Sequence, residues 1–383
     1  MCTVVRSFMP VGQGAFYVEQ FTSCNPRINL VFDCGSDTDL NLLHNNIDEI
    51  FQKGETIHAV FISHLHEDHI NGLEYLLSNY NVKKIYFPLL CSEEKTLTLL
   101  YYLFSKTTHT TKDFFFRFVS DPFAYLVSKD KQAEIIYVSP DDPDIYEYSQ
   151  QYGETIRSGK NVAKHIKGIA SHYCEWEIIP FNFRNKQRII DLVKRLGNVF
   201  SKHFPSKNIC IDESFDFDYY WKNFPCIRDD VKKAYEGLRG SLNTNSMVVF
   251  SGTNTNVYQH FCLSKTADCY HCNNCCSCIY KSGCLYTGDY DCSGNSKFND
   301  LNSAYSNYWN SIGCITIPHH GSKHNYNPNL TSNRHVFCII SAGINNNYQH
   351  PHALVMRDLL SMRIPTFWIN ENKNSKFQTY IYC

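Results

Sequence analysis

The segment SHLHEDH, residues 63–69, places three histidines and one aspartate directly behind the apolar run AVFI. Imidazole and carboxylate groups are preferred ligands of cations such as Zn(II). His64 and His66 are two residues apart, so at a strand end both side chains point the same way. Asp68 and His69 follow in a turn and can face a neighbouring position. The spacing predicts two adjacent cations, which would also keep these crowded ligands deprotonated.

Two ions need more ligands, and the sequence offers them where later predicted strands end. Asp289 in YTGD is an aspartate able to bridge both ions. The pair His319-His320 in IPHHG can complete the second site, although the sequence leaves open which of the two binds metal. Asp33, at the end of INLVFDCG, is placed to hydrogen-bond a ligand from outside. The alternative is a set of histidines without metal, and these distant partners argue against it.

The order of predicted elements indicates a layered α/β architecture. Strands, helices and further strands alternate over the first 90 residues, and apolar segments such as AVFI are typical of buried strands. We predict strands at 2–8, 14–21, 28–35, 58–64, 83–89, 133–139, 174–183, 246–252, 284–290, 314–321, 336–343, 365–370 and 376–383. Helices are predicted at 38–53, 71–80 and 352–361, with helical patches at 97–104 and 115–127.

Seven segments carry a family resemblance. VGQG, LVFDCG, SHLHEDHINGL, NTNSMVVF, YTGD, IPHHGSKH and NYQHPH follow one another in this order. The set resembles the metallo-β-lactamase domain of the DNA-uptake protein ComEC, and next to it phosphodiesterases and phosphorylcholine esterases of the same fold. Two departures matter: ComEC domains often carry Asp at the position of His66, and the membrane segments of ComEC are absent.

The resemblance implies a single domain over 1–383 with the αββα sandwich of the metallo-β-lactamase fold. Helical insertions are expected at 93–170 and 184–240, and a Cys-rich insertion at 262–284. It also implies two Zn(II) ions, with Mn(II) or iron as alternatives. The family's third histidine for the first ion has no motif match here. By position His172 is expected, with His109 and His165 as alternatives.

The chemistry expected from this fold branch is phosphodiester hydrolysis by attack of metal-bound hydroxide. Asp68 would bind metal and orient the hydroxide. His350 and His352, in QHPH before a predicted helix, are candidates for phosphate contact or general acid, and helix capping is the alternative role. The histidine of the 319–320 pair that does not bind metal is a third candidate.

A basic segment favours nucleic acid as the substrate. Residues 184–207 contain seven Lys or Arg against one Asp and an apolar stripe at Ile189, Ile190, Val193, Leu196 and Phe200. An amphipathic helix with a basic face would add salt-dependent, sequence-independent affinity. A solvated face or a protein-docking surface is the alternative. The expected contacts are Arg184, Lys186, Arg188, Lys194, Arg195 and, on a later loop, Lys323.

The chain has 18 cysteines, and eight of them fall between residues 262 and 292. In a reducing compartment such a cluster favours metal ligation over disulfides. We predict a structural zinc knuckle, because so short a segment cannot fold on apolar burial. An iron–sulfur cluster and redox-active or unliganded thiols are the alternatives. The candidate ligands are Cys269, Cys272, Cys275, Cys276, Cys278 and Cys284.

Net charge and hydropathy limit which other classes of protein the chain can belong to. With 36 basic and 37 acidic residues, no global field marks a nucleic-acid or membrane binder, so such a surface has to be local. No targeting or membrane-spanning pattern is present, and we expect a cytoplasmic protein. Three alternatives stay open: a small-molecule phosphodiesterase or esterase, a lactone or β-lactam hydrolase, and an effector subunit that depends on a partner such as an ATPase in a bacterial defence-like system.

Overall fold

The computed structural model describes ten stretches of the chain, and they form two compact units. One unit, here called the sheet unit, comprises residues 1–88, 133–183 and 246–383; the other, the helical unit, comprises 89–132 and 184–245. The described stretches are 3–105, 108–141, 154–169, 175–183, 186–207, 209–211, 215–238, 246–253, 257–260 and 279–382.

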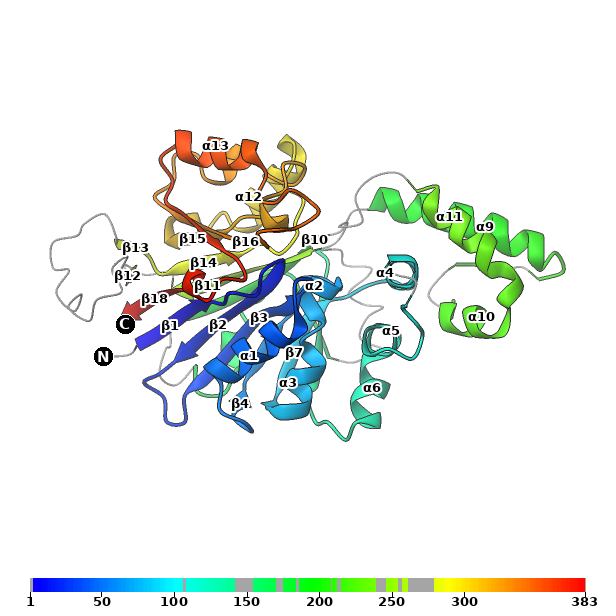
Figure 1. The fold of residues 1–383 in the computed structure, drawn as a ribbon, viewed down its shortest axis with the longest axis horizontal. Helices are drawn as coiled ribbons and strands as arrows, with labels where there is room; N and C mark the ends of the chain where they lie inside the picture. Colours follow the sequence, from blue (N-terminus) through cyan, green and yellow to red (C-terminus); the bar gives the residue numbers. More distant parts are fainter. Residues whose placement is uncertain are drawn as a thin grey trace. The chain divides into compact units, whose positions relative to one another are not determined.

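A ten-stranded sheet contains the N-terminal half of the sheet unit (Figure 1). Its strands run in the order β13-β12-β18-β1-β2-β3-β5-β7-β8-β9. From β3 to β9 neighbouring strands are parallel, so their carboxyl ends meet at one edge. The bounds are β1 Thr3–Phe8, β2 Gly14–Phe21, β3 Ile28–Ser36, β5 Ala59–Phe61, β7 Lys84–Pro88, β8 Glu134–Ser139, β9 Glu154–Arg157, β12 Tyr258–His260, β13 Ile279–Lys281 and β18 Phe377–Tyr382.

A six-stranded sheet forms the other half, in the order β10-β11-β14-β15-β16-β17. Strands β14 to β17 are parallel, so the residues that follow β14 and β15 also meet at one edge. The bounds are β10 Trp176–Phe183, β11 Ser246–Thr253, β14 Gly283–Tyr286, β15 Ile312–Thr316, β16 Phe337–Ser341 and β17 Thr366–Ile369. A separate short pair, β4 Thr56–Ile57 and β6 Asn81–Val82, lies beside the larger sheet.

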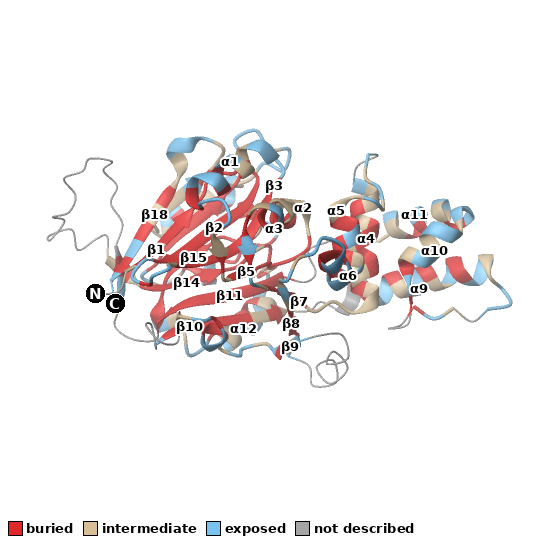
Figure 2. Ribbon diagram, turned by 90° about the horizontal axis from the view of Figure 1, so that it is seen from below, coloured by how far each residue is buried: buried red, intermediate tan, exposed pale blue. Residues whose placement is uncertain are grey.

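The two sheets pack face to face over an apolar core, and helices cover their outer faces (Figures 1 and 2). Phe32, Phe61 and Tyr286 stack within that core, which joins the sheets. A second cluster packs α12 and α13 onto the six-stranded sheet. This is the αββα sandwich expected from the sequence. The helices are α1 Leu40–Ile50, α2 Glu67–Ile70, α3 Leu73–Asn79, α12 Asn295–Ala304 and α13 Ala353–Ser361.

The helical unit is built around aromatic side chains. Phe104 of one segment contacts Trp221 and Tyr235 of the other, and thus ties together its two stretches of chain. In α9 the buried stripe is Ile189, Leu192, Leu196, Val199 and Phe200, so the expected inclusion of Ile190 is wrong: that side chain is exposed. The helices are α4 Ser92–Ser105, α5 Phe114–Ser120, α6 Pro122–Ser128, α9 Lys186–His203, α10 Phe217–Asn223 and α11 Arg228–Glu236.

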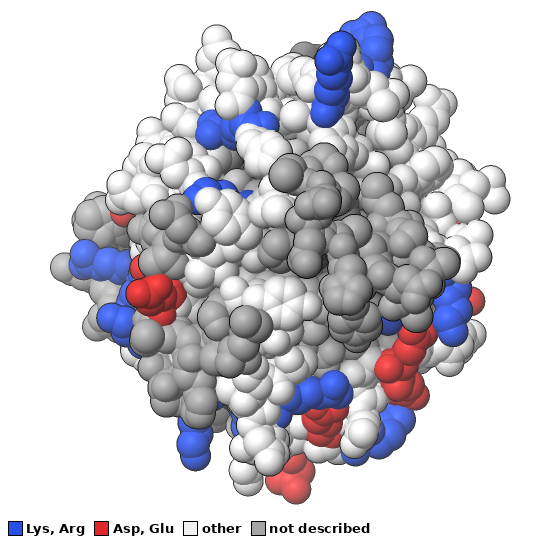
Figure 3. Space-filling view, turned by 90° about the vertical axis from the view of Figure 1, so that its left-hand side faces the viewer, with Lys and Arg blue, Asp and Glu red and all other residues white. Residues whose placement is uncertain are grey.

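Two observations limit the kinds of surface present. No helix in the described part of the chain is long and apolar enough to cross a bilayer. On the face drawn in Figure 3, basic and acidic side chains stand singly or side by side, and among the described residues neither sign forms a continuous patch there.

Candidate metal centre

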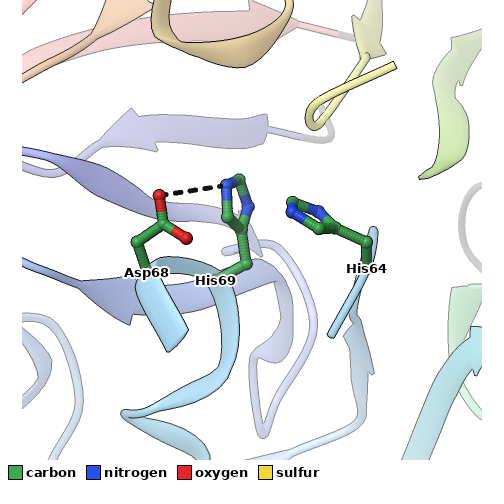
Figure 4. A group of neighbouring side chains, drawn as sticks. All are labelled: His64, Asp68 and His69. Carbon is green, nitrogen blue, oxygen red and sulfur yellow. Dashed lines mark ion pairs between the residues drawn. The ribbon is translucent and has the colours of Figure 1, made fainter. Parts of the chain in front are cut away.

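The carboxyl ends of β3 and β5 place the first group of candidate ligands. The two strands are parallel with Phe32 opposite Phe61, so Asp33 and the residues after β5 come to the same edge. Ser63 then donates twice to Asp33, from its backbone N (2.6 Å) and its Oγ (2.8 Å). The chain leaves β5 through His64 and begins α2 at Glu67, which carries Asp68 and His69 back toward the strand end. Figure 4 shows the His64, Asp68 and His69 side chains facing one another.

Glycines allow this helix to approach the sheet closely. A Cβ on Gly35 would lie 2.3 Å from the backbone carbon of Asp68 and 2.4 Å from the nitrogen of His69. A Cβ on Gly14 would lie 2.7 Å from the Asp68 oxygen. No side chain fits at these contacts. Gly14 of VGQG and Gly35 of FDCG therefore let the ligand-bearing turn sit directly on β2 and β3.

The carboxyl ends of β14 and β15 bring in the second group. Asp289 follows β14, and His319 and His320 follow β15; the adjacent parallel strands place all three at one edge. Both histidines have positive φ, 49° and 55°. Asp33 and Gln349 share this conformation, so four of the seven non-glycine residues of positive φ in the described chain lie at or beside the site. Such backbone strain clusters where function demands a fixed side-chain position.

Asp289 divides the surrounding histidines into two sets. Its Oδ2 lies 3.5 Å from Nε2 of His64 and 3.5 Å from Nε2 of His319. Its Oδ1 lies 3.2 Å from Nε2 of His69 and 3.6 Å from Nε2 of His320. His66 belongs to the Oδ2 set because its ligand atom lies close to those of His64 and Asp289. Asp68 belongs to the Oδ1 set because its Oδ2 lies 3.0 Å from Nε2 of His320. One carboxylate thus faces two neighbouring groups of ligands, as a bridging ligand would.

Hydrogen bonds fix which ring nitrogen of these histidines points inward. Nδ1 of His320 is 2.7 Å from the carbonyl of Ser341, and Nδ1 of His69 is 2.9 Å from Asp33 Oδ2. Both partners only accept, so each Nδ1 carries the proton and each Nε2 keeps its lone pair when the ring is neutral. Since the Ser63 hydroxyl already donates to Asp33, it accepts from Nδ1 of His64 at 3.0 Å.

Asn325 fixes which ring nitrogen of His319 points inward. Its Nδ2 donates to the carbonyl of Asp289 (3.1 Å), which fixes the amide so that Oδ1 faces Nδ1 of His319 at 2.9 Å. His319 therefore also presents its Nε2 lone pair toward Asp289. In all four histidines one nitrogen is held from outside and the other is left for a ligand, which is the usual arrangement around protein-bound metals.

The electrostatics of the site fit a cation. Burial lowers the pKa of His64 well below its usual range and that of His66 to about 4. Burial also lowers the pKa of His69, but the carboxylates of Asp68, Asp289 and Asp33 outweigh it and raise that pKa. Nε2 of His64 is buried without a hydrogen-bond partner in the described chain. Inward lone pairs and buried carboxylates suit a positive charge between them, and a divalent ion would supply it.

The two later histidines of QHPH have different environments. The His350 ring lies 5.4 Å from that of His319 and 6.4 Å from that of His320, and its Nδ1 is buried without a partner in the described chain. His352 caps α13, where its Nδ1 accepts from the nitrogen of Leu354 at 3.2 Å. The structure therefore brings His350 to the site and gives His352 the alternative, capping role. A catalytic role for His352 is not supported by this placement.

Several sequence-predicted residues lie elsewhere or outside the described residues. His109 stacks on Tyr102 in the helical unit, and His165 lies in a short turn near Lys84 and Glu134, so neither belongs to the ligand cluster. Cys284 is buried in β14 beside Cys314 of β15, in the core rather than on a projecting knuckle. Lys323 is exposed after the histidine pair. The residues outside the description are His172, Arg184, Cys269, Cys272, Cys275, Cys276 and Cys278, together with the side chains of Lys186 and Arg188.

Three residues that hold the ligands were not predicted: Ser63, Asn325 and Ser341. Ser63 precedes His64 directly, so its adjacency to the motif was the available signal. Asn325 lies six residues after His319 in a loop, and a lone asparagine there is typical of turns. Ser341 acts through its backbone carbonyl, for which a sequence carries no signal.

The structure thus combines the αββα sandwich of the metallo-β-lactamase fold with a cluster of His and Asp side chains that could hold a metal ion. The sequence model of the Metallo-beta-lactamase superfamily matches residues 15–149. The match includes SHLHEDH and ends before Asp289 and the histidine pair. No curated protein sequence matches the chain.

Solved structures show distant likenesses. Unliganded yeast PDE1 is 9% identical with a TM-score of 0.43, over 100% of both chains. A diphosphatase of the PhnP family is 8% identical with a TM-score of 0.31, over 96% of this chain and 86% of that one. The long form of RNase Z from yeast is 9% identical with a TM-score of 0.34, over 89% of this chain and 36% of that one.

Proposed function

We propose that the protein is a dinuclear-metal hydrolase of phosphodiesters whose substrate is nucleic acid. One observation carries the metal part: the two oxygens of Asp289 face separate sets of inward-pointing histidines. His64, His66 and His319 would surround one ion, and Asp68, His69 and His320 the other, with Asp289 shared. Under this assignment His319 and His320 would each bind one ion. His319 would then be the third histidine of the first ion, so no further histidine is required there. Nitrogen-rich ligation favours Zn(II).

Divalent ions at this position would lower the pKa of a water molecule and neutralise phosphoryl oxygens. The chain's own residues supply orientation and proton control. Asp33, Ser63, Asn325 and the Ser341 carbonyl hold the ligand rings in one tautomer, so no reorganisation is needed when substrate binds. In hydrolysis the water oxygen bonds to phosphorus, the ester P–O bond breaks, and the leaving oxygen needs a proton or a hydrogen bond.

His350 is the proposed donor to that leaving oxygen or to the phosphoryl group. Burial lowers its pKa to about 3, with His319 and His320 acting in the same direction, so the ring is neutral and keeps one N–H. Its buried Nδ1 has no partner in the described chain, which a substrate oxygen would supply. A neutral imidazole that donates a hydrogen bond can stabilise negative charge on the departing oxygen.

The nucleic-acid part of the proposal rests on charge. The sequence of the helical unit contains 18 Lys and Arg against 13 Asp and Glu, whereas that of the sheet unit contains 18 against 24. The helical unit of this almost neutral chain therefore has a net positive charge, and the sheet unit a net negative one. Exposed Lys194 on α9 belongs to that excess, and phosphate neutralisation by such residues supports sequence-independent binding.

The test is an activity screen with defined metal content. Protein loaded with Zn(II) or Mn(II) is assayed against single- and double-stranded DNA and RNA and against bis(p-nitrophenyl) phosphate. We expect close to two ions per site by elemental analysis and metal-dependent cleavage of nucleic acid. The double variant Asp68→Ala, His69→Ala should lose both. Cleavage of bis(p-nitrophenyl) phosphate alone would retain the phosphodiesterase and reject the nuclease. Metal-loaded protein that cleaves no phosphodiester would reject the proposal.

A further inference from the structure

A row of aromatic rings leads from the ligand cluster to solvent. His320, in the cluster, is buried. The His350 ring lies 6.4 Å from it with 26° between the ring planes, and the Tyr348 ring lies 5.8 Å from His350, again at 26°. Tyr348 is 58% exposed. The three rings thus step outward, and Tyr348 marks the solvent end beside the candidate reaction site.

The loop that carries Tyr348 is fixed in place, although it lies at the surface. Oδ1 of Asn346 accepts from the backbone nitrogens of Tyr348 (3.0 Å) and His350 (2.9 Å). Its Nδ2 donates to the carbonyls of Gly343 and His350. One half-buried amide group therefore uses its full hydrogen-bonding capacity on this turn. Gln349 between the two rings has φ 59°, a conformation that such a network can impose on a non-glycine residue.

An exposed tyrosine held rigidly beside a phosphate site has a specific use. Its ring has only two side-chain torsions to restrain, so little conformational entropy is lost when another ring stacks on it. Every nucleobase has an aromatic face, and stacking on such rings is tolerant of sequence. A nucleobase is joined to its phosphate through one sugar, and the Tyr348 ring is reached from His320 through the single ring of His350.

We propose that Tyr348 is a stacking platform for the nucleobase of the nucleotide whose phosphate is cleaved. The inference rests on the proposed function and narrows its substrate class to nucleotide-containing diesters. Tyr348 would act as a specificity-determining residue, and His350 beneath it would contact the phosphate. A base-free diester would gain nothing from the platform.

The test compares two esters with the same leaving group. One is the p-nitrophenyl ester of thymidine 5′-monophosphate, and the other is methyl p-nitrophenyl phosphate, which has no base. The readout is the kcat/KM for the nucleotide ester divided by the kcat/KM for the base-free ester. We expect Tyr348→Ala to lower this ratio by about 5- to 100-fold, which is the usual range for loss of one base–aromatic stack. Tyr348→Phe should keep the ratio. Tyr382→Ala, which removes an exposed tyrosine on β18, is the matched control and should also keep it.

Binding gives a second readout that does not depend on turnover. Zn(II)-loaded wild type should bind thymidine 5′-monophosphate more tightly than inorganic phosphate in calorimetry, and Tyr348→Ala should lose that preference. An unchanged ratio and an unchanged preference in Tyr348→Ala would overturn the platform while the phosphodiesterase stands. An equal loss in Tyr348→Phe would assign the effect to the hydroxyl instead of the ring. If wild type hydrolyses neither ester, the proposed function itself fails.

Discussion

At the scale of single residues, the centre depends on a carboxylate that faces in two directions. Both oxygens of Asp289 are committed, one to each set of histidines, and the residue is 2% exposed. Removing it would uncouple the two sets at once, whereas each of the four histidines around it faces only one of its oxygens.

Asp289→Asn should therefore reduce the binding of both ions. The amide keeps the size of the side chain but presents one oxygen and no charge, so we expect zinc content well below two and kcat/KM down at least about 100-fold, as loss of several kcal/mol implies. Asp291→Asn is the control, because Asp291 lies two residues further on and pairs with Lys297. Two tightly bound zinc ions in Asp289→Asn would contradict the bridging role.

Asp33 offers a test of ligand orientation without direct metal contact. Its φ is 54°, a conformation that asparagine tolerates, so Asp33→Asn leaves the backbone unstrained. The new NH₂ group cannot accept from both Ser63 Oγ and His69 Nδ1, and His69 loses its fixed tautomer. Zinc affinity, measured against a competing chelator, should fall about 10- to 100-fold. Asp39→Asn, a conservative change at the N-cap of α1, should leave it unaltered.

The sequence pointed to the residues that carry the ligand atoms more readily than to those that orient them. SHLHEDH, Asp289 and the histidine pair are recognisable by residue type and spacing. The outer contacts come from a hydroxyl, an amide and a backbone carbonyl, groups that occur in every loop. That His350 lies beside the cluster while His352 caps a helix depends on the path of the loop between β16 and α13, which spacing alone does not determine.

At the scale of elements, strand ends position the site, and ion pairs secure the turns between them. Glu55, before β4, accepts from Arg27 Nη2 at 2.7 Å and Asn29 Nδ2 at 2.8 Å, both at the start of β3. Burial raises the pKa of Glu55, but the hydrogen bonds, with Arg27 foremost, outweigh burial and lower it to about 2.

This lowered pKa predicts a pH dependence. A carboxyl group whose pKa falls on folding stabilises the fold above its ordinary value of 4.5, and that contribution is lost as the pH falls toward about 2. Glu55→Gln should lower the free energy of unfolding at pH 7 and flatten its decline between pH 4.5 and 2 in urea titrations. Burial raises the pKa of Glu177, so Glu177→Gln should have the opposite sign at pH 7. Parallel acid limbs for wild type and Glu55→Gln would refute this account.

Strongly apolar strands were the most predictable elements. The segments INLVFDCG, SMVVFSG and VFCIISAG form β3, β11 and β16 as expected. The short strands β9, β12 and β13 were missed, because three or four residues of mixed polarity have no clear period. The helical patch 115–127 is two helices, since Asp121 caps a new helix that starts at Pro122.

At the scale of the whole molecule, the feature that bears on nucleic-acid binding is how charge is divided between the helical unit and the sheet unit. Net charge near zero hides an excess of basic residues in the helical unit and of acidic residues in the sheet unit. Composition alone could not reveal this division, because the helical unit is assembled from two separate stretches of sequence. The basic character of 184–207 was visible, but which of its charges are free depends on the packing of α9 against α11.

Two lysines on α9 test whether this excess binds nucleic acid. Lys194 is exposed and has no acidic partner among the described residues, whereas Lys202 lies 2.6 Å from Asp230 on α11. A free lysine that meets a phosphate releases a counterion, so Lys194→Ala should reduce the slope of log affinity against log salt by about 0.9. Lys202→Ala should reduce it less, because Asp230 already neutralises that charge. Binding is measured by fluorescence anisotropy with single- and double-stranded oligonucleotides in the presence of Zn(II), at several salt concentrations. Equal slopes for wild type and Lys194→Ala would remove α9 from the interface and favour its alternative role as a protein-docking or solvated face.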